Sequence, residues 1–373
     1  MNIPPLVWFA IFIAFCVVVA IQLFYYLFFF RRLAAYNPTP KQQTQEYPVS
    51  VIICARDEAD NIVKNLPGVL IQNYKTTHEI IVVNDNSVDE SKYLLEEFRK
   101  SFKNLNPVDL TQEAKLIPGK KFPLSMGIKA AKYEIVLLSD ADCVPASEFW
   151  LQKMQDAYQP GIEIVLGYGA YHKHPGLLNK LIRFETFHTA LQYFSYALAG
   201  RTYMGVGRNL SYKKALFFNN KGFSSINQIP GGDDDLFINM VATKTNTAIM
   251  IDPDAYTLSE PKRTWHDWWR QKYRHYSAAR FYNPKHKFML GLYSFSHVLV
   301  YPFLIASLFY CWWLALAVFG TRLIVQSVTW YICMKKLNEK DLWPLFLFFD
   351  IWMFIYYFLF VPALWKKPRK NWN

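Results

Sequence analysis

Residues 49–58 read VSVIICARDE, and this stretch decides the fold, because a short apolar run ends abruptly in charged residues. A run of this length bounded by polar residues is typical of a strand that is buried on both faces. A helical pattern follows at residues 61–70, and a second apolar run, IIVV, occupies residues 80–83. The alternation of buried strands with helices predicts an α/β fold with a mainly parallel sheet.

Acidic residues come directly after the predicted strands. Residues 84–89 (NDNSVD) follow the second strand. After a helical pattern at residues 90–100, a third strand is predicted at residues 134–138 (EIVLL), and residues 139–142 (SDAD) follow it. In open α/β sheets, ligands bind at the carboxyl ends of the strands. The sequence therefore places a ligand site at this edge of the sheet.

Four further elements are expected before the C-terminal apolar block. The patterns indicate a strand near residues 162–171, an amphipathic helix near residues 177–198 and a helix that begins after Asp235. Residues 265–282 carry seven aromatic residues among basic ones. A helix of that composition suits a position on the headgroups of a membrane surface.

The composition excludes several classes of protein. With 373 residues, 52% of them hydrophobic, and only 15 glycines, the chain is neither disordered nor fibrous. Its five cysteines form no CxxC pair, so no disulfide or zinc framework is indicated. The net charge of +12 comes without a basic arm or an RNA-binding signature. We therefore expect no nucleic acid as a partner, and anionic lipid headgroups or nucleotides explain the charge as well.

Two apolar blocks indicate membrane segments. Residues 6–30 contain no charge, and residues 290–364 contain few. A cleaved signal peptide is the alternative for the first block, but the apolar stretch is longer than usual and lacks a basic start. Arg31 and Arg32 follow the first block directly, so the positive-inside rule predicts that residues 33–285 are cytoplasmic. We expect an integral protein of an inner or plasma membrane.

The clearest chemical signal is the pair of carboxylates at Asp140 and Asp142. Two carboxylates separated by one residue at a strand end can hold Mg²⁺ or Mn²⁺ and leave positions open for phosphate oxygens. The alternative for an isolated pair is a strand-end turn capped by an aspartate. The pair is accompanied by Asp85 and Asp89 after the previous strand, by Lys120 before a helix, and by three aspartates at residues 233–235.

Taken in their order along the chain, these sequence motifs resemble those of a membrane-anchored, bacterial-type glycosyltransferase of inverting family 2, which has the GT-A nucleotide-diphospho-sugar fold. The resemblance extends over about residues 47–280. It implies a metal-dependent transfer of a sugar from a nucleotide donor. The matching runs are residues 49–58, residues 82–89, Gly119 and Lys120 with Leu124 and Gly127, and residues 139–142.

The resemblance also implies roles for single residues. Glu58 and Asp85 would contact the nucleoside, Lys120 would lie near the donor, and Asp142 would be nearest the metal. Residues 204–209 (MGVGRN) resemble the loop beside the transferred sugar, although a tight turn explains its glycines equally well. The implied donor-binding residues are Arg56, Glu58, Asp85, Lys120, Asp140, Gly205, Asn209, Gln271 and Arg274, and the implied metal ligands are Asp140 and Asp142.

The catalytic base is expected among Asp233, Asp234 and Asp235. The family motif reads Glu-Asp-x-Asp-Leu, whereas this chain has Gly232 in place of the glutamate. Aligning Asp235 and Leu236 with the end of the motif makes Asp233 the base, with Asp234 as a competitor. At least one of the three aspartates is expected to cap the following helix.

Residues 271–275 (QKYRH) resemble the Gln-x-x-Arg-Trp motif of polysaccharide synthases, but His275 replaces the tryptophan. This departure argues against processive polymer synthesis. The alternative is a surface helix on which Arg274 binds a lipid phosphate instead of the donor.

These observations predict transfer of a sugar to a hydroxyl of a lipid-linked or polysaccharide acceptor of the cell envelope. A polyprenyl-phosphate glycosyltransferase is the main alternative, and a processive synthase a weaker one. A transporter would explain Arg322 and Asp350 in apolar segments but not the large polar insert. A nucleotidyltransferase would require a glycine-rich phosphate loop near the first strand, which residues 56–60 do not supply.

The predicted organisation has six parts, and the C-terminal topology is ambiguous. Spans near residues 290–309, 312–333 and 342–364 would give four crossings in all, but would place the basic tail outside, against the positive-inside rule. In the alternative, one C-terminal segment lies in the interface. The parts are a membrane helix (1–32), a linker (33–48), a cytoplasmic GT-A domain (49–263), an interfacial helix (264–288), membrane helices (289–365) and a basic tail (366–373).

Overall fold

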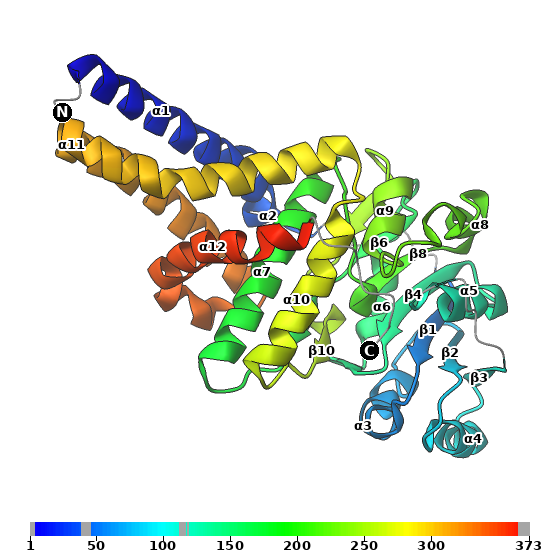
Figure 1. The fold of residues 1–373 in the computed structure, drawn as a ribbon. Helices are drawn as coiled ribbons and strands as arrows, with labels where there is room; N and C mark the ends of the chain where they lie inside the picture. The colour runs from blue at the N-terminus through cyan, green and yellow to red at the C-terminus, as the bar shows by residue number, and fades with distance from the viewer. Residues whose placement is uncertain (1–3, 39–45, 112–116, 118, 365–373) are drawn as a thin grey trace.

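The computed structural model describes residues 4–38, 46–111, 117 and 119–364. Its centre is a seven-stranded sheet in the order β3-β2-β1-β4-β8-β6-β9 (Figure 1). The strands are β1 (Val49–Ala55), β2 (His78–Asp85), β3 (Leu105–Leu110), β4 (Ile135–Asp140), β6 (Ile164–Leu166), β8 (Leu210–Lys213) and β9 (Thr247–Ile249). The predicted α/β class with a mainly parallel sheet is confirmed.

The parallel half of the sheet aligns the acidic residues that the sequence placed at its edge. In the pairing of β1 with β2, Ala55 faces Asn84, the residue before Asp85. In the pairing of β1 with β4, Cys54 faces Asp140. Because parallel strands end at a common edge, Asp85 and Asp140 reach the same side of the sheet.

Two strand predictions need correction. Strand β3 was not expected, because Asn106, Pro107 and Asp109 interrupt its apolar pattern, which an edge strand tolerates. The single strand expected near residues 162–171 is instead two short strands, β6 and β7 (Gly169–Tyr171), that belong to different sheets. The chain bends between them around the buried Asn209, whose amide donates to the Tyr168 carbonyl at 3.1 Å.

A small second sheet lies beside the end of β4. It has the order β5-β10-β7, with β5 at Cys143–Pro145 and β10 at Thr257–Ser259. Strand β10 pairs antiparallel with β5 and parallel with β7. Because β5 starts three residues after the end of β4, this sheet fixes the turn that carries Asp142.

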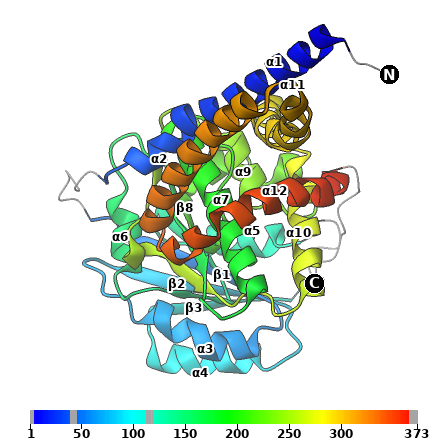
Figure 2. The same cartoon turned by 90° about the vertical axis from the view of Figure 1, so that its left-hand side faces the viewer.

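Alternate residues of β1 enter two different cores, as a buried strand requires. Val51 and Ile53 pack with α3 (Ala59–Leu70), α4 (Ser91–Ser101) and α6 (Trp150–Asp156). Ile52 and Cys54 pack with α5 (Lys121–Ala130) and α7 (Leu177–Leu198). Figure 2 shows α3 and α4 on one side of the sheet and α5, α7 and the apolar helices on the other.

Helix α7 has the predicted bounds but not the predicted amphipathic character. Of its 22 residues, 15 are buried, including Arg183, Glu185 and His188. The helix lies between the sheet and the apolar helices, as the stacking of Phe184 on Phe349 shows, with ring centroids 4.1 Å apart. A helix covered from both sides has no solvent face for a polar stripe to mark.

Among the residues that the structure describes, three helices are long and apolar enough to cross a membrane: residues 5–35, Pro284–Lys336 (α11) and residues 340–360. The first consists of α1 (Pro5–Phe24), a π-helix (Tyr25–Phe30) and α2 (Arg31–Ala35). Helix α11 is interrupted at Cys311, where φ is −153° and ψ is 90°. This break separates the two segments that the sequence predicted at residues 290–309 and 312–333.

Helix α1 lies along the first half of α11 (Figure 1). Trp8 contacts Phe309 near one end, and Gln22 donates to the Ser296 hydroxyl at 2.6 Å near the other, so the two helices are antiparallel. The C-terminal segment comprises a 3₁₀ helix at Lys340–Leu345 and α12 (Phe346–Phe360). Arg322 of α11 pairs with Asp350 of α12 at 2.6 Å.

The predicted interfacial segment spans two helices. Helix α10 covers Trp265–Ala279, and α11 already begins at Pro284, so the boundary expected at residue 288 falls inside α11. Trp265 and Trp269 are exposed, but Trp268 is buried against Phe360 of α12. The first apolar helix likewise extends to Ala35, three residues past the predicted boundary. The basic tail and residues 39–45 of the predicted linker lie outside the described residues.

The remaining short elements connect these parts. Helix α8 (Lys214–Asn219) follows β8, and α9 (Asp235–Val241) begins where the sequence predicted a helix after the three aspartates. Short 3₁₀ turns occupy Gly207–Asn209, Ser224–Ile226, Pro253–Ala255 and Val361–Leu364.

Candidate functional site

The loops after β1 and β2 are bonded to each other at the carboxyl edge. The Val88 amide donates to Asp57 at 2.8 Å, and the Ala59 amide donates to Asp89 at 2.9 Å. Asp57 adopts a left-handed backbone with φ of 55°, which aspartate tolerates better than most residues. Asp89 therefore has a structural role, and the two loops form one rigid wall.

Arg56, Glu58 and Asp85 lie on this wall. The Arg56 guanidinium is 3.9 Å from the Asp85 carboxylate. Burial raises the pKa of Glu58, and the charges of Asp142 and Asp140 raise it further. The effect of these charges indicates that Glu58 lies near the paired aspartates.

Asp140, Asp142 and Cys143 can offer one ligand atom each, and these three atoms lie within 4.8 Å of one another. Asp140 is the last residue of β4, and the Asp142 side chain is exposed. Lost solvation raises the pKa of Asp142, and the neighbouring Asp140 charge raises it further. A divalent cation would relieve this repulsion between carboxylates, so the residues fit Mg²⁺ or Mn²⁺.

Lys120 lies between the paired aspartates and the third acidic cluster. Its ammonium donates to the Asp140 carboxylate. Burial alone would lower the pKa of Lys120, but Asp140 and, less strongly, Asp233 raise it, so the side chain stays charged. The same ammonium lowers the pKa of Asp140 against the effect of burial. Residues from β4, the start of α5 and the start of α9 therefore meet here.

The three consecutive aspartates have different partners. Asp234 is the N-cap of α9, as expected of at least one of them, and accepts hydrogen bonds from the amides of Asp235 and Gly207, both at 2.7 Å. Asp235 accepts a bond from the Tyr282 hydroxyl at 2.7 Å. Asp233 makes no hydrogen bond or ion pair with the described residues. Its carboxylate is the one that remains free to accept a proton.

Burial separates the acidities within the cluster. It raises the pKa of Asp234 to about 8 and that of Asp235 to about 6, and the charge of Asp233 contributes to both shifts. Lys121 faces all three carboxylates. Its ammonium is buried and donates to the carbonyls of Ile229 and Gly231, which fixes the loop before Asp233.

The glycine that replaces the family's glutamate has a local cause. Gly232 has φ of +81°, a backbone that favours glycine, and a Cβ at this position would lie 2.3 Å from the Leu236 side chain. A glutamate could not occupy this position without moving the start of α9. The glycine at this position therefore follows from the backbone conformation of the loop before α9.

Two residues of the loop predicted to lie beside the sugar, Gly205 and Asn209, are constrained by packing and by hydrogen bonds, respectively. A Cβ on Gly205 would lie 2.8 Å from Leu210, so this glycine is required by packing. Asn209 is fully buried, donates to the carbonyls of Tyr168 and Ala255, and accepts from Trp150. The prediction that Asn209 contacts the donor is therefore corrected: its amide joins the two sheets.

Arg208, in the same loop, was not among the predicted site residues. Burial raises the pKa of Asp140, Lys120 lowers it, and the charges of Arg208 and Arg274 lower it further. Arg208 and Lys121 were not predicted because Arg208 follows the glycines of its loop and Lys121 follows Lys120, which already had assigned roles. The sequence signal for Arg208 was a charged residue next to a glycine, and the signal for Lys121 was a charged residue inside an apolar helical pattern.

Helix α10 brings Arg274 toward the paired aspartates. The helix is held on α7 by Glu185, which pairs with Lys272 at 2.9 Å and accepts from Trp268 at 3.1 Å. The Arg274 side chain is exposed, and its charge acts on Asp140. Gln271 is on the same helix and makes no hydrogen bond with the described part of the site.

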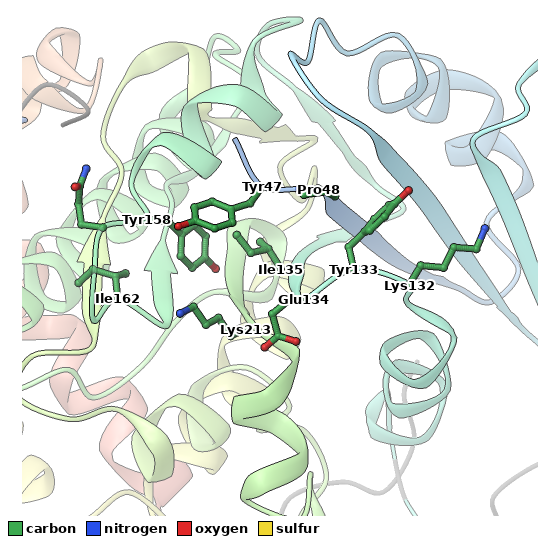
Figure 3. A pocket seen from close by; sticks show the side chains of 10 residues that line it. Tyr47, Pro48, Lys132, Tyr133, Glu134, Ile135, Tyr158, Ile162 and Lys213 are labelled. Carbon is green, nitrogen blue, oxygen red and sulfur yellow. The ribbon is translucent and has the colours of Figure 1, made fainter. Parts of the chain in front are cut away.

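A separate pocket of about 370 Å³ lies at the opposite edge of the sheet (Figure 3). Its lining includes Tyr47, Lys132, Glu134, Tyr158 and Lys213, near the start of β1 and β4. None of the predicted site residues lines this pocket. The chemistry-bearing residues gather at the carboxyl edge instead.

Comparison with known families identifies the central domain. Residues 50–217 match the model of glycosyl transferase family 2. The match begins in β1 and ends in α8, so it contains Asp140 and Asp142 but stops before residues 233–235.

Two curated relatives match parts of the chain. The probable glycosyltransferase YdaM of Bacillus subtilis is 26% identical over 249 residues, which cover 64% of this chain and 56% of the relative. Glycosyltransferase AglE of Haloferax volcanii is 31% identical over 121 residues, which cover 32% of this chain and 38% of the relative. The chain spans about half the length of the first of these relatives and less of the second.

A similar solved structure is that of the mannosyltransferase PcManGT from Pyrobaculum calidifontis in complex with GDP-Man and Mn²⁺. The two structures superpose with a TM-score of 0.57 at 20% identity, covering 92% of this chain and 98% of the other. At this identity the likeness shows the fold alone, and it confirms the predicted GT-A class.

Proposed function

We propose, from the premise that this chain is a glycosyltransferase of family 2, that it transfers a sugar from a nucleotide-diphospho-sugar to an acceptor hydroxyl at a membrane surface. The observation that carries the proposal is the position of Lys120 between the Asp140 carboxylate and Asp233. A pair of carboxylates that could hold a metal ion and a carboxylate without a hydrogen-bond partner among the described residues would thus lie on two sides of Lys120.

The donor diphosphate would lie at the paired aspartates. Asp140 and Asp142 would hold Mg²⁺ or Mn²⁺, which supplies positive charge for the diphosphate leaving group. Glu58 and Asp85 would contact the nucleoside, Arg56 would support Asp85, and Gln271 and Arg274 would close the donor site from α10. The contacts that support this arrangement are the Arg56–Asp85 pair and the field of Arg274 at Asp140.

Asp233 would take the proton from the acceptor hydroxyl as that oxygen attacks the anomeric carbon and the nucleoside diphosphate leaves. General-base assistance of this kind contributes roughly 10²–10⁴-fold to the rate. A single displacement inverts the anomeric configuration. Asp234 and Asp235 would position Asp233, since both carboxylates already bond to the protein.

The second candidate is a polyprenyl-phosphate glycosyltransferase. A phosphate acceptor needs no strong base, so the free carboxylate of Asp233 favours a hydroxyl acceptor on a lipid-linked glycan or polysaccharide. Processive synthesis is the weakest candidate, because His275 stands where polymer synthases have tryptophan.

The apolar helices would anchor the catalytic domain on the cytoplasmic side of an inner or plasma membrane, in contact with its lipids. Four full crossings were predicted, but the packing of α12 favours the interfacial alternative for this segment. Phe349 near its start stacks on α7, and Phe360 at its end contacts Trp268 of α10. Contacts with the catalytic domain near both of its ends favour a position of α12 along that domain over a crossing of the bilayer.

Cysteine labelling tests this topology. In a variant whose other reactive cysteines are replaced, an impermeant reagent should leave Asn371→Cys unmodified in intact cells and label it after lysis. Labelling in intact cells would instead support four crossings of the membrane. Labelling of residues 49–280 from outside would overturn the functional proposal, because nucleotide sugars are made in the cytoplasm.

A donor screen tests the reaction itself. The purified full chain is incubated with a panel of nucleotide sugars and Mg²⁺ or Mn²⁺, and nucleoside diphosphate release is measured with and without membrane extracts as a source of acceptor. GDP-mannose with Mn²⁺ is the first pair to test, because the mannosyltransferase of similar fold was solved with both. Release that depends on metal and on acceptor supports the proposal, and no release from any donor contradicts it.

A further inference from the structure

Arg208 is a fixed cation beside the paired aspartates that is not paired with either of them. It lies in the 3₁₀ turn Gly207–Asn209, directly before β8. Because Leu210 of β8 pairs with Leu138 of β4, the turn lies beside the end of β4, where Asp140 begins the metal-binding turn.

The position of Arg208 is fixed at both its backbone and its side chain. Its carbonyl accepts a hydrogen bond from Thr257 at 3.0 Å. Its guanidinium donates to the Ser259 hydroxyl at 3.1 Å and to the Gly169 carbonyl at 2.9 Å. The same group lies over the Tyr171 ring, 4.3 Å from the centroid. The small second sheet therefore holds this cation in one place.

The partners of the guanidinium are all neutral. Within the described residues, no carboxylate lies within ion-pair distance of Arg208, and only two of its five N–H groups donate hydrogen bonds. Three N–H groups remain for another acceptor. A planar cation with unused donors, fixed beside a metal-binding turn, matches the oxygens of a phosphate group.

We propose that Arg208 binds the diphosphate of the donor and acts as a second, fixed cation beside the metal ion. The inference rests on the proposed function, because it requires a nucleoside diphosphate in this cleft. Arg208 would add a positive charge that belongs to the protein itself and does not depend on a bound metal ion. The leaving diphosphate would then be stabilised from two sides, by the metal at Asp142 and by the guanidinium.

A purely structural role for Arg208 is the competing explanation. The Cys143 thiol lies 2.9 Å from the Ser259 hydroxyl and 3.3 Å from Asp142, so Arg208 could act on Asp142 through these groups. Ser259→Ala interrupts this chain and removes one of the two hydrogen bonds of the guanidinium, but it keeps the charge of Arg208, its bond to Gly169 and its contact with Tyr171. Arg201→Gln removes an exposed arginine seven residues earlier and serves as the matched control for loss of one positive charge.

The experiment is titration calorimetry of the full chain in detergent with GDP and UDP, and with GMP and UMP, each with and without Mn²⁺. Arg208→Gln should weaken diphosphate binding by about tenfold or more and monophosphate binding much less, because a monophosphate presents one phosphate group fewer to the guanidinium. Arg208→Lys should recover part of the loss, and Ser259→Ala and Arg201→Gln should leave diphosphate affinity within about threefold of the wild type.

Three outcomes would overturn the proposal. Equal diphosphate affinity in Arg208→Gln and wild type excludes the contact, provided that thermal unfolding shows both to be folded. Equal losses for diphosphate and monophosphate, or a loss in Ser259→Ala as large as in Arg208→Gln, assign Arg208 a structural role and leave the proposed function standing. Absence of wild-type binding to any nucleoside diphosphate would overturn the donor assignment itself.

Discussion

Two pairs of a basic residue with an aspartate occupy different parts of this molecule. Lys120 and Asp140 lie partly exposed at the carboxyl edge of the sheet, and Arg322 and Asp350, which join α11 to α12, are buried. In both pairs an opposite charge lies beside the carboxylate. The two aspartates differ in how many hydrogen bonds their carboxylate oxygens accept from the protein.

Asp350 has no acceptor position left for a ligand. Its two oxygens accept hydrogen bonds from both terminal nitrogens of Arg322, from Tyr301 at 2.7 Å and from Gln326 at 2.7 Å. A carboxylate whose bonds are all made by the protein serves the packing of the helices. A charged pair in an apolar region usually suggests a functional site, but here the contacts indicate that the pair holds α11 and α12 together.

Asp140 is the opposite case. It accepts one hydrogen bond within the described residues, from Lys120, and a second carboxylate, Asp142, lies two residues away. Asp233 makes no hydrogen bond or ion pair with the described residues. Incomplete coordination therefore distinguishes a reactive acidic cluster from a structural one, and the following changes test that distinction.

The largest effect is expected for Asp142→Asn. The amide keeps the shape of the side chain but removes its charge from the metal, so turnover should fall by about 10³-fold or more while the fold is retained. Nucleoside diphosphate release and the unfolding temperature are measured side by side. Asp60→Asn, at an exposed site on α3, is the control. EDTA should inactivate the wild type and Mg²⁺ or Mn²⁺ restore it; wild-type turnover in Asp142→Asn would refute the metal assignment.

Arg322→Leu should affect stability instead of chemistry. It leaves Asp350 buried without its charge partner, which costs about 3–5 kcal/mol. Unfolding in detergent should show this loss, while turnover per folded molecule stays near that of the wild type. The double variant Arg322→Leu/Asp350→Leu should recover much of the stability. A turnover defect in that stable double variant would show that the pair takes part in function.

Asp233→Asn should lower kcat by about 10²-fold with donor affinity nearly unchanged, because a base acts in the transition state. Steady-state kinetics and donor titration separate the two quantities. If Asp234→Asn shows this pattern and Asp233→Asn does not, the assignment of the base is wrong. If neither variant matters, the phosphate-acceptor alternative gains support.

The smallest effect concerns pH. Burial raises the folded-state pKa values of Asp234 and Asp235 above the usual 3.8, to about 8 and about 6. Between those values and 3.8 the folded state binds more protons than the unfolded state, so these groups make the protein less stable as pH rises from about 4 to 8. Asp233 and Lys121, which face them, modulate the shifts.

Asp234→Asn removes one of these titrations. The fall in unfolding temperature between pH 5 and pH 8 should become shallower in this variant by several degrees, since each kcal/mol corresponds to about 2–4 °C in a chain of this size. Scanning fluorimetry at several pH values measures the slope. An unchanged slope in a folded variant would show that Asp234 does not titrate in this range.

Much of the fold followed from local patterns. The apolar runs predicted at β1 and β2 lie within the observed strands, the run predicted at residues 134–138 begins one residue before β4, and the bounds of α7 were predicted without error. Strand periodicity and apolar length depend on neighbours in the sequence, so the sequence reveals them. The break at Cys311 also lies between the two predicted apolar segments.

Other features depended on distant contacts. The split between β6 and β7 follows from Asn209, some forty residues later in the chain, and the all-round burial of α7 follows from apolar helices at both ends of the sequence. The roles of Arg208 and Lys121 depend on carbonyls and hydroxyls more than 35 residues away. No local pattern carries such information.

The sequence by itself determined the class of the sheet, the edge at which the acidic residues gather and the apolar segments, because each depends on periodicity or on register along a strand. Only the tertiary structure decided which of three consecutive aspartates is free. Asp234 is held by Gly207 and Asp235 by Tyr282, so the contacts that occupy them come from separate parts of the chain. Identical side chains differ in chemistry only through their partners, and folding alone brings those partners together.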